Sequence, residues 1–364
     1  MSSSSLTSLT IHSGQGDYQV DFPVDLTQLL VQLESFSNAV VLVDENVARI
    51  YSEQLAPLLS RLPWLSVPAT EEEKTLAGTQ RALEFFQRNN ATKQTIVIAI
   101  GGGIIQDIAT LSSHIYYRGL RWVYIPTTLL GMCDSCIGAK ASINFGAFKN
   151  QLGAFHSPHR VLVCLPFLDT LSDTEIISGY GEITKLLLIG SPAQFAFLTK
   201  SMDEGGLRNP NLSRFIYESL NVKKPIIEKD EYERDLRRIL NYGHTFGHAL
   251  EAITNHGIPH GKAVAWGVDL ANYIAVERGL LDRAEYDSIH VFIQKYFAHC
   301  LNRPVSATEL IDASKRDKKV ADGKVNLILL RTAGELKIVP TAYDAQLHQE
   351  VERHLADRTI LSWP

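Results

Sequence analysis

The sequence predicts an α/β fold in the first half of the chain and a mainly helical fold in the second half. Apolar runs of strand length lie at residues 38–44, 94–100, 121–128 and 160–165, and helical patterns separate them. Strands that alternate with helices pair in parallel, and strands that are apolar throughout belong to a sheet covered on both faces. After these runs the pattern becomes helical, and one late apolar run at 325–332 interrupts it.

Length and composition are those of an ordinary soluble globular protein with two domains. The chain has 364 residues, of which 45% are hydrophobic and 21% charged. This length exceeds what one small core organises, so we expect a nucleotide-binding α/β domain at 1–171 and a helical domain at 172–364. The net charge of −5 argues against a nucleic-acid surface. Without a signal-peptide pattern, a membrane-length apolar run or a disulfide framework, a cytoplasmic enzyme with no membrane partner is expected.

The first strand and the second strand each end in residues suited to a nucleotide. The run NAVVLVD ends in Asp44, which could accept hydrogen bonds from a ribose, and a helical pattern follows at 47–62. The stretch IAIGGGIIQDIAT places three glycines between a strand and a helix, where backbone N–H groups can approach a phosphate. The Rossmann spacing is not met, because Gln106 stands where a third glycine belongs. A tight turn without a ligand explains the glycines nearly as well.

A histidine motif in the second half is a candidate metal site. In NYGHTFGHALE, His244 and His248 are four residues apart, so a helix places both on one face. Thr245 stands where a zinc protease carries glutamate, which disfavours that class. His260 lies downstream in IPHGKAV, and Glu182 lies upstream in a helical pattern that is otherwise apolar. Two histidines and a glutamate with an open position form a catalytic zinc arrangement, although a pair of solvated histidines is the commoner explanation of such spacing.

Two further patterns are ambiguous from the residues alone. The stretch MCDSCIGAK contains a Cys-x-x-Cys pair, which suits a zinc knuckle, a redox couple or two packed core residues. Several lysines and one arginine lie beside glycine or asparagine. Most lysines are solvated surface, but Lys140 and Lys149 lie among small or apolar residues. A pocket that gathers them would favour a substrate with several negative charges.

Together these motifs resemble the 3-dehydroquinate synthase family, the sugar phosphate cyclases. The resemblance runs from about residue 38 to 335 and rests on GGGIIQDIA, YYRG, PTTLLGMCDSCIGAK, KNQLGAF, GEITK, LRRILNYGHTFGHALE and HGKAVAWG. It implies an α/β nucleotide-binding domain with a parallel sheet, a helical second domain, a homodimer, NAD, and a divalent zinc or cobalt ion. It also implies that Asp134 is the working residue of the CDSC stretch, so that both cysteines are packing residues.

The resemblance assigns roles to individual residues. The metal ligands are expected to be Glu182, His244 and His260, with His248 turned instead toward the substrate phosphate. The cofactor residues are expected to be Asp44, Asn46, Glu71, Lys74, Gly102, Gly103, Ile104, Asp107, Thr127, Thr128, Leu130 and Thr170. The substrate residues are expected to be Asp134, Lys140, Lys149, Asn150, Lys185, Lys223, Arg237, Asn241, His248 and Lys319, with Arg118 reaching the phosphate from a neighbouring subunit.

The reaction implied by the resemblance is a phosphate-eliminating cyclisation with no net redox change. NAD⁺ oxidises a ring hydroxyl, phosphate leaves, the hydride returns, and an aldol step closes a carbocycle. The expected substrate is a phosphorylated acidic sugar, 3-deoxy-arabino-heptulosonate 7-phosphate, converted to 3-dehydroquinate. Arg237 and Asn241 are four apart, so on a helix they share one face and could hold its carboxylate. The alternatives are an amino-dehydroquinate or sedoheptulose 7-phosphate cyclase and a metal-dependent polyol dehydrogenase.

The sequence also departs from the family pattern. It reads GAKAS where relatives read GGKT, and NFGAFKN where they read NHPLGKN, which brings Phe145 and Phe148 beside Lys149. Gln106 and His156 are also unusual for the family. These differences indicate a side branch.

Overall fold

The computed structural model describes residues 6–146, 148–255, 257–315 and 324–363. The chain divides into two compact units. The first contains the residues up to Leu171 together with Lys224–Tyr232, and the second contains Ser172–Lys223 and the chain from Glu233 onward. In the described part of the chain, no helix is both long enough and apolar enough to cross a membrane.

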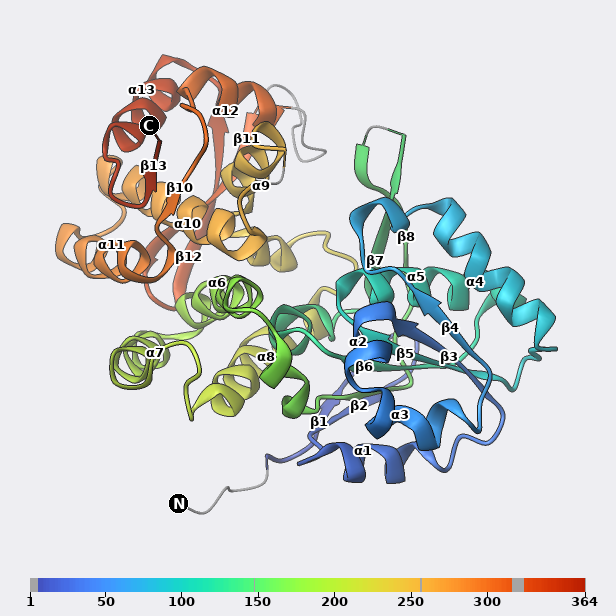
Figure 1. The fold of residues 1–364 in the computed structure, drawn as a ribbon. Helices are drawn as coiled ribbons and strands as arrows, with labels where there is room; N and C mark the ends of the chain where they lie inside the picture. Colours follow the sequence, from blue (N-terminus) through green and yellow to red (C-terminus); the bar gives the residue numbers. More distant parts are fainter. Residues whose placement is uncertain (1–5, 147, 256, 316–323, 364) are drawn as a thin grey trace. The chain divides into compact units, whose positions relative to one another are not determined.

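The first unit is built on a seven-stranded, mostly parallel sheet (Figure 1). Its central strands are apolar and wholly buried, as a sheet covered on both faces requires. Only β1 runs antiparallel to its neighbour among the paired strands of this sheet. In spatial order the strands are β1 (Leu9–Ile11), β2 (Tyr18–Asp21), β9 (Arg160–Leu162), β6 (Trp122–Pro126), β5 (Ile96–Gly101), β3 (Ala39–Asp44) and β4 (Trp64–Val67).

The strand order reverses between β3 and β5. From β3 the chain moves outward to β4, and it then returns to β5 on the other side of β3. Right-handed crossovers place the helices of these two directions on opposite faces of the sheet. Accordingly α1 (Leu26–Leu33), α2 (Glu45–Ile50) and α3 (Ser52–Leu59) lie on one face, and α4 (Leu76–Arg88) and α5 (Gly103–Ile115) on the other (Figure 1). In open α/β sheets, ligands bind at such a reversal, which here lies at the carboxyl ends of β3 and β5.

A separate two-stranded hairpin extends from this unit. It consists of β7 (Lys140–Phe145) and β8 (Phe148–Phe155), which pair antiparallel and contact α5. Short helical turns join the larger elements. They are η1 (Glu71–Glu73), η2 (Tyr116–Arg118), the π-helical turn η3 (Gly131–Ser135) and η4 (Leu165–Thr170).

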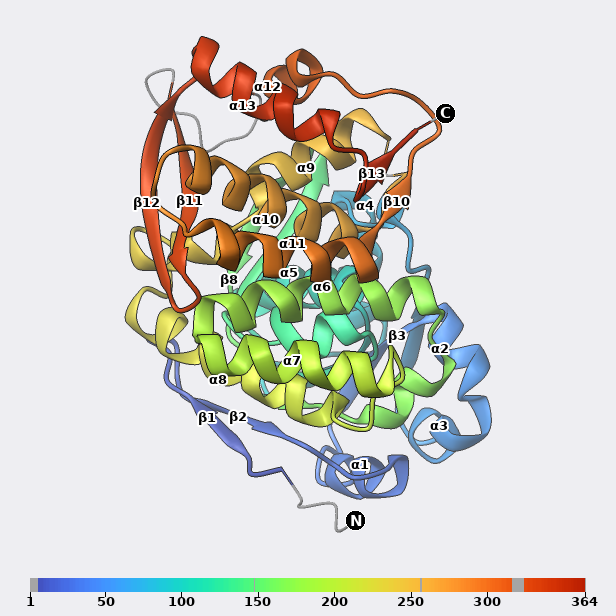
Figure 2. The same ribbon diagram turned by 90° about the vertical axis from the view of Figure 1, so that its left-hand side faces the viewer.

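The second unit packs helices around α10 (His260–Glu277), which is buried along most of its length and contacts α6, α9, α11 and α13. Figure 2 shows α6, α10 and α11 side by side. Two small sheets complete the unit, a β11–β12 hairpin and the short β10–β13 pair. The other elements are α6 (Asp173–Gly190), α7 (Pro192–Gly205), η5 (Leu236–Asn241), α9 (His244–Ile253), α11 (Arg283–Phe297), α12 (Ala307–Lys315), α13 (Ala345–Ala356), β10 (His299–Cys300), β11 (Lys324–Thr332), β12 (Glu335–Ala342) and β13 (Leu361–Ser362). Helix α8 (Leu212–Lys229) belongs to this unit up to Lys223, and its last turns belong to the first unit.

The predicted fold class is confirmed, with local corrections. The helical pattern at 47–62 is not one helix, because the chain breaks at Tyr51 into α2 and α3. The strand predicted at 160–165 ends at Leu162. Strand β11 has an antiparallel partner, β12, that the helical pattern of the second half did not predict. The short strands β1, β2 and β4 and the β7–β8 hairpin were also missed.

A buried carboxylate ties three helices of the second unit together. Asp269 on α10 is fully buried and accepts hydrogen bonds from His290 Nδ1 on α11 at 3.1 Å and from His354 Nε2 on α13 at 2.7 Å. Burial alone would raise the pKa of Asp269, but these two hydrogen bonds outweigh it and lower the pKa. The bond to Asp269 raises the pKa of His290, against the effect of its own burial.

This cluster predicts a pH-dependent contribution to stability. The lowered pKa of Asp269 gives stabilisation that is present above its usual pKa of 3.8 and is lost as the pH falls through the folded value. The raised pKa of His290 gives stabilisation that is complete below its usual 6.5 and is lost as the pH rises through the folded value. We expect Asp269→Ala to lower the free energy of unfolding by about 3 kcal/mol near pH 6, and by less near pH 9.

Urea unfolding at the two pH values measures this difference. The matched control is Asp287→Ala on α11, whose carboxylate is about half exposed and pairs with Arg283, and whose loss is expected to cost less than about 0.5 kcal/mol. An Asp269→Ala variant with the same small loss as this control, or a loss that does not change with pH, would contradict the account.

Candidate active site

The neighbouring ends of β3 and β5 bring Asp44 next to the glycine-rich turn. Both follow neighbouring strands, and a Cβ atom on Gly101 would lie 3.2 Å from Cβ of Asp44. Asp44 Oδ1 also caps α2, accepting the backbone N–H groups of Asn46 at 2.7 Å and Val47 at 3.3 Å. Burial raises the pKa of Asp44, although these backbone hydrogen bonds oppose the shift. Asp44 is therefore a capping residue at the position where open α/β sheets bind nucleotides.

The glycines leave room for an anion at the start of α5. Gly102 is the N-cap residue and offers no side-chain hydrogen bond, and a Cβ on Gly103 would meet nothing within 4 Å. On Gly102 a Cβ would lie 3.0 Å from Thr128 Cγ2, so the 127–130 segment borders the turn. The first N–H groups of a 13-residue helix thus open onto clear space with the positive end of the helix dipole behind them. This geometry fits a pyrophosphate.

A polar network holds the hairpin against α5 and η1. Lys74 Nζ lies 2.7 Å from Asp107 Oδ2 and donates to Asn150 Oδ1 at 2.8 Å. Asp107 Oδ1 accepts the backbone N–H of Ser142 at 3.0 Å. Burial raises the pKa of Asp107 although Lys74 opposes the shift. The structure thus brings together two residues predicted for the cofactor, Lys74 and Asp107, and one predicted for the substrate, Asn150.

Glu71 connects this network to Lys149. Its Oε1 atom accepts from Asn144 Nδ2 at 2.8 Å and lies 3.3 Å from Lys149 Nζ. Burial alone would raise the pKa of Glu71, but Asn144, Lys74 and Lys149 together lower it. The side chain of Lys149 is 39% exposed. Lys140 is exposed as well, because a two-stranded hairpin covers few of its own side chains.

Asp134 lies on the π-helical turn η3 beside two buried cysteines. Cys136 N–H donates to Gly131 O at 3.0 Å, the five-residue bond of a π-helix, and such turns are frequent at functional sites. Cys133 and Cys136 are nearly fully buried, and their thiols lie 3.7 and 3.4 Å from the carbonyls of Leu130 and Met132. The Cys-x-x-Cys pair is thus part of the core under the turn.

Three other residues singled out in the first unit are exposed, whereas Thr127, directly after β6, is buried. Arg118 is exposed and follows Tyr117, and both have positive φ angles, 64° and 50°. Thr170, at the end of η4, shares a hydrogen bond of 3.0 Å with the hydroxyl of Tyr51 next to α2. Phe145, at the end of β7, is 57% exposed. The side chain of Phe148 is not among those that the structure describes.

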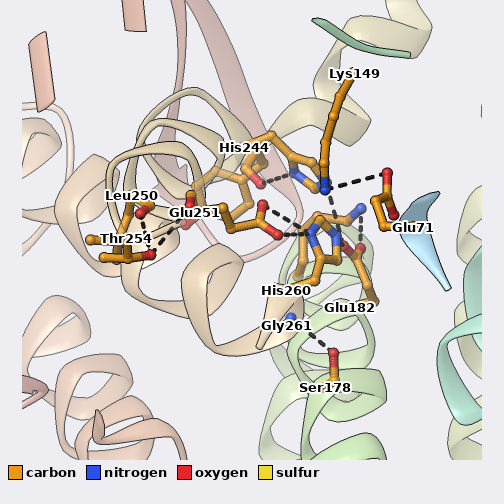
Figure 3. A network of polar contacts seen from close by, with 12 residues as sticks. Glu71, Lys149, Ser178, Glu182, His244, Leu250, Glu251, Thr254, His260 and Gly261 are labelled. Carbon is orange, nitrogen blue, oxygen red and sulfur yellow. Dashed lines mark hydrogen bonds and ion pairs between the residues drawn. The ribbon is translucent and has the colours of Figure 1, made fainter. Parts of the chain in front are cut away.

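The second unit gathers Glu182, His244 and His260 at one point (Figure 3). Glu182 Oε1 lies 3.3 Å from His244 Nε2 and 3.1 Å from His260 Nε2. The three side chains come from α6, the first residue of α9 and the first residue of α10. Zinc bonds of about 2.0–2.2 Å in a tetrahedral site place ligand atoms roughly 3.3 Å apart, which matches these separations.

Hydrogen bonds to the other ring nitrogens orient both histidines. His244 Nδ1 donates to the carbonyl of Tyr242 at 3.1 Å, and His260 Nδ1 lies 3.2 Å from both oxygens of Glu251. In the neutral rings, both Nε2 lone pairs therefore face the Glu182 carboxylate. Three electron-pair donors that converge in this way can share a metal ion, and without one a proton on His260 satisfies the same contact. Carboxylate and carbonyl partners of this kind are typical behind metal-binding histidines.

The electrostatics of the cluster show the same demand for positive charge. Burial would raise the pKa of Glu182, but Lys185, His244 and His260 hold it well below its usual value. Lys185 is buried on the same helix and forms an ion pair with the other oxygen, Oε2. Burial and Lys185 lower the pKa of His244. Burial opposes a charge on His260, yet its bonds to Glu182 and Glu251 raise the pKa to about 10.

His248 belongs to the same cluster. Its ring centre lies 5.0 Å from that of His244 and 5.8 Å from that of His260, and each of the three rings offers one nitrogen within 4.8 Å of the others. The prediction that α9 places His244 and His248 together is therefore confirmed. Four side chains, those of Glu182, His244, His248 and His260, are close enough to bind a cation. Glu182, His244 and His260 stand out among them, because both histidine nitrogens lie within 3.3 Å of one carboxylate oxygen.

Lys223 and Arg237 are buried, with 6% and 5% of their surface exposed. Arg237 and Asn241 lie on η5, a 3₁₀-helix, and not on an α-helix. The expectation that they share one face is wrong, because at three residues per turn positions i and i+4 are rotated by about 120°. Asn241 instead donates to Glu233 Oε1 at 2.7 Å. Lys319 lies outside the described residues.

Sequence reasoning missed three residues that organise these clusters. Glu251 orients His260, Asn144 bridges Glu71 to the hairpin, and Gln106 bonds to the turn that carries Asp134. Glu251 had a usable signal, since it lies seven residues after His244 and returns to nearly the same face of α9. Asn144 had none, because the hairpin itself was not predicted.

Fold and site together define a class of protein: an α/β unit with a glycine-rich turn where the strand order reverses, and a helical unit with a carboxylate–histidine cluster suited to a divalent metal. Family models give this class a name. A model described as 3-dehydroquinate synthase N-terminal matches residues 64–178, and one described as 3-dehydroquinate synthase C-terminal matches residues 179–320. The chain belongs to the 3-dehydroquinate synthase family of sugar phosphate cyclases and is an enzyme of that family, a phosphate-eliminating lyase.

Individual proteins show the same relationship. The 3-dehydroquinate synthase of Acidithiobacillus ferrooxidans is 34% identical over 361 residues, which are 96% of this chain and 99% of that protein. A 2-epi-5-epi-valiolone synthase from Streptomyces hygroscopicus, solved with NAD⁺ and Zn²⁺ bound, is 25% identical with a TM-score of 0.83 over 95% of this chain and 99% of that one. A 2-deoxy-scyllo-inosose synthase complexed with carbaglucose-6-phosphate, NAD⁺ and Co²⁺ shares the fold, at 22% identity and a TM-score of 0.83 over 95% and 100% of the chains.

Proposed function

We propose that this enzyme converts 3-deoxy-arabino-heptulosonate 7-phosphate into 3-dehydroquinate with release of phosphate. The proposal rests on the family and on the identity to 3-dehydroquinate synthases over nearly the whole chain. The observation that carries it within the structure is the convergence of Glu182, His244 and His260, oriented from behind by Glu251. A site of this kind suits a reaction in which an oxygen of the substrate must be polarised.

NAD and a divalent zinc or cobalt ion are the proposed cofactors. Bound NAD would supply a hydride acceptor that is restored in each turnover, and the metal would act as a Lewis acid. Glu182, His244 and His260 are the proposed metal ligands. The pyrophosphate would lie at Gly102, Gly103 and Ile104, and Asp44 would meet a ribose. The remaining cofactor residues are Asn46, Glu71, Lys74, Asp107, Thr127, Thr128, Leu130 and Thr170.

The chain's own residues prepare these sites. Lys185 keeps the carboxylate of Glu182 ionised, so that Oε1 stays available while Oε2 is engaged. Lys74 and Asp107 fix the hairpin through Asn150 and the Ser142 amide, which sets where Lys149 can reach. Lys149 lies beside Glu71 and has enough exposure to meet a phosphorylated sugar. His248 and, in a homodimer, Arg118 of the second copy are proposed for the phosphate.

Two buried cations support an acidic sugar as the substrate. Lys223 and Arg237 lie in a poorly solvated environment, where hydrogen bonds to a carboxylate are stronger than in water. A guanidinium adds a planar fork that matches a carboxylate in two-point contact. Asn241 is placed nearby in sequence at the end of η5. These residues are proposed to select the carboxylate, with Asp134 and Lys140 serving the rest of the ring.

A second cyclase substrate is favoured by one specific feature. The hairpin tip reads NFGAFKN, and Phe145 is exposed next to the segment that carries Lys149. A different ring substituent could be accommodated there, as in an amino-dehydroquinate cyclase or one that uses sedoheptulose 7-phosphate. A polyol dehydrogenase would use the same kind of metal site but has no need of the lysines around it.

The metal proposal predicts which side chains hold one ion per chain. His260→Ala and Glu182→Gln are expected to lose most of the bound metal, because three protein ligands are already the minimum for an open site. Glu251→Gln should weaken metal affinity by about 10- to 100-fold through the orientation of His260. His248→Ala is the matched control and should keep its metal. Elemental analysis after dialysis measures the content.

Two results would contradict this ligand set. Wild-type metal content in His260→Ala would show that the metal is not bound at this cluster. Retention of metal in Glu182→Gln with loss in His248→Ala would move the ion to the three histidines.

The substrate proposal predicts a preference that depends on Arg237. Phosphate release should show a higher kcat/KM for 3-deoxy-arabino-heptulosonate 7-phosphate than for sedoheptulose 7-phosphate. Arg237→Ala should reduce that ratio by about 10- to 100-fold, since charge-assisted hydrogen bonds contribute about 1.5–3 kcal/mol. Arg238→Ala, an exposed neighbour on the same turn, should leave the ratio unchanged. A wild-type preference for sedoheptulose 7-phosphate, or the same ratio in Arg237→Ala, would refute the carboxylate assignment.

A further inference from the structure

Gln106 forms a two-point hydrogen bond with Ser135. Its amide Nε2 donates to the Ser135 carbonyl at 2.6 Å, and the Ser135 hydroxyl donates to Gln106 Oε1 at 2.6 Å. Gln106 is only 5% exposed and Ser135 is half-buried, so both bonds are partly shielded from solvent. Ser135 is the last residue of the π-helical turn η3 and directly follows Asp134. The amide therefore holds the end of the turn on which Asp134 is presented.

Side chains hold the turn at both ends, and the pair of bonds from Gln106 acts at the far end together with contacts of Ser135 to Tyr124 and of the Gly138 N–H to the Tyr18 hydroxyl at 3.1 Å. At its start, Gly131 N–H donates to Thr128 Oγ1 at 3.1 Å, and a Cβ on Gly131 would lie 3.2 Å from the Tyr124 hydroxyl, so the turn approaches the sheet closely there. After Ser135 the chain passes through Gly138 and Ala139, both with positive φ, before β7 begins. A short π-helical turn followed by such a segment is not held by regular secondary structure.

The residue after Gln106 holds the other end of the same segment. Asp107 Oδ1 accepts the backbone N–H of Ser142 at 3.0 Å on β7. Adjacent residues on α5 thus bind Ser135 and Ser142. The segment from 134 to 142 contains Asp134 and Lys140, and the helix that holds it is the one whose first turn forms the glycine-rich cradle.

We propose that Gln106 is a positioning residue for Asp134, and that its amide couples the helix at the cofactor cradle to the turn that presents Asp134 to the substrate. This inference rests on the proposed function for the role of Asp134. The pair of hydrogen bonds between Gln106 and Ser135, here called the clasp, can be tested without measuring activity. A glutamine is suited to the task, because one amide supplies a donor and an acceptor to the two groups of one serine. The side chain at 106 would then set how Asp134 is held.

The test removes the hydrogen bonds of the clasp by substituting first Gln106 and then Ser135. Gln106→Met keeps length and apolar bulk but cannot bond to Ser135, and Ser135→Ala removes the hydroxyl alone. Ser112→Ala is the matched control, because Ser112 is a fully buried hydroxyl on the same helix that bonds within the helix to Ile108 O at 2.7 Å. Hydrogen–deuterium exchange of residues 131–137 in the NAD- and metal-loaded protein reports the turn directly.

We expect faster exchange of residues 131–137 in Gln106→Met and Ser135→Ala, and unchanged exchange in Ser112→Ala. Unchanged exchange in both clasp variants would overturn the proposal whatever the enzyme's substrate. If the wild type releases no phosphate from any sugar phosphate but exchange accelerates, the proposed function fails while the clasp stands.

Kinetics then test the role of Asp134. Gln106→Met should lower kcat/KM for the substrate by about tenfold or more, the effect of losing one or two buried hydrogen bonds. NAD affinity should change by less than about twofold, since the cradle residues are intact. In a double-mutant cycle with Asp134→Asn, the two losses should not multiply. Independent, multiplying losses would show that Gln106 does not act through Asp134.

Discussion

The arrangement of helices in the second unit depends on one buried carboxylate, which must be balanced by positive charge. Glu182 is almost completely removed from water on α6, and burying an unpaired carboxylate is costly. Lys185 compensates one oxygen, while two histidine nitrogens converge on the other. Those histidines are the first residues of α9 and α10, so the two helices must begin beside the middle of α6. Close contacts between glycines make this possible, because a Cβ on Gly181 or Gly261 would collide with the facing backbone.

In the first unit one helix has a comparable role. The N-terminus of α5 lies where the strand order reverses, and its next turn carries Gln106 and Asp107, which hold the segment bearing Asp134 and Lys140. Lys74, which follows η1, binds Asp107 on the same helix and Asn150 on the hairpin, so it connects η1 and the hairpin to α5. Residues proposed for cofactor and for substrate are therefore attached to one rigid element, which favours a fixed relation between them.

The sequence was informative wherever one pattern determined a structure. Whole-strand apolar runs predicted β3, β5 and β6, and the spacing of His244 and His248 predicted their shared face on α9. It was uninformative where tertiary contacts decided the outcome. Strand β7 alternates polar and apolar residues in KASINF, but its partner β8 does not, and the hairpin is held by Asp107, Asn144 and Asn150. The 3₁₀-helix at Arg237 cannot be distinguished from an α-helix by six residues of sequence. Glu251 looks like any helical surface acid until α10 brings His260 to it.

In the proposed reaction a hydride is removed from the substrate and returned to it within one catalytic cycle while phosphate departs. The most direct measurement follows phosphate release and NADH absorbance together in the same reaction of the metal-loaded enzyme with 3-deoxy-arabino-heptulosonate 7-phosphate. The account predicts many phosphates released per bound NAD with no accumulation of NADH, and loss of phosphate release in Glu182→Gln. One NADH formed per turnover without phosphate release would show a dehydrogenase and would contradict the account.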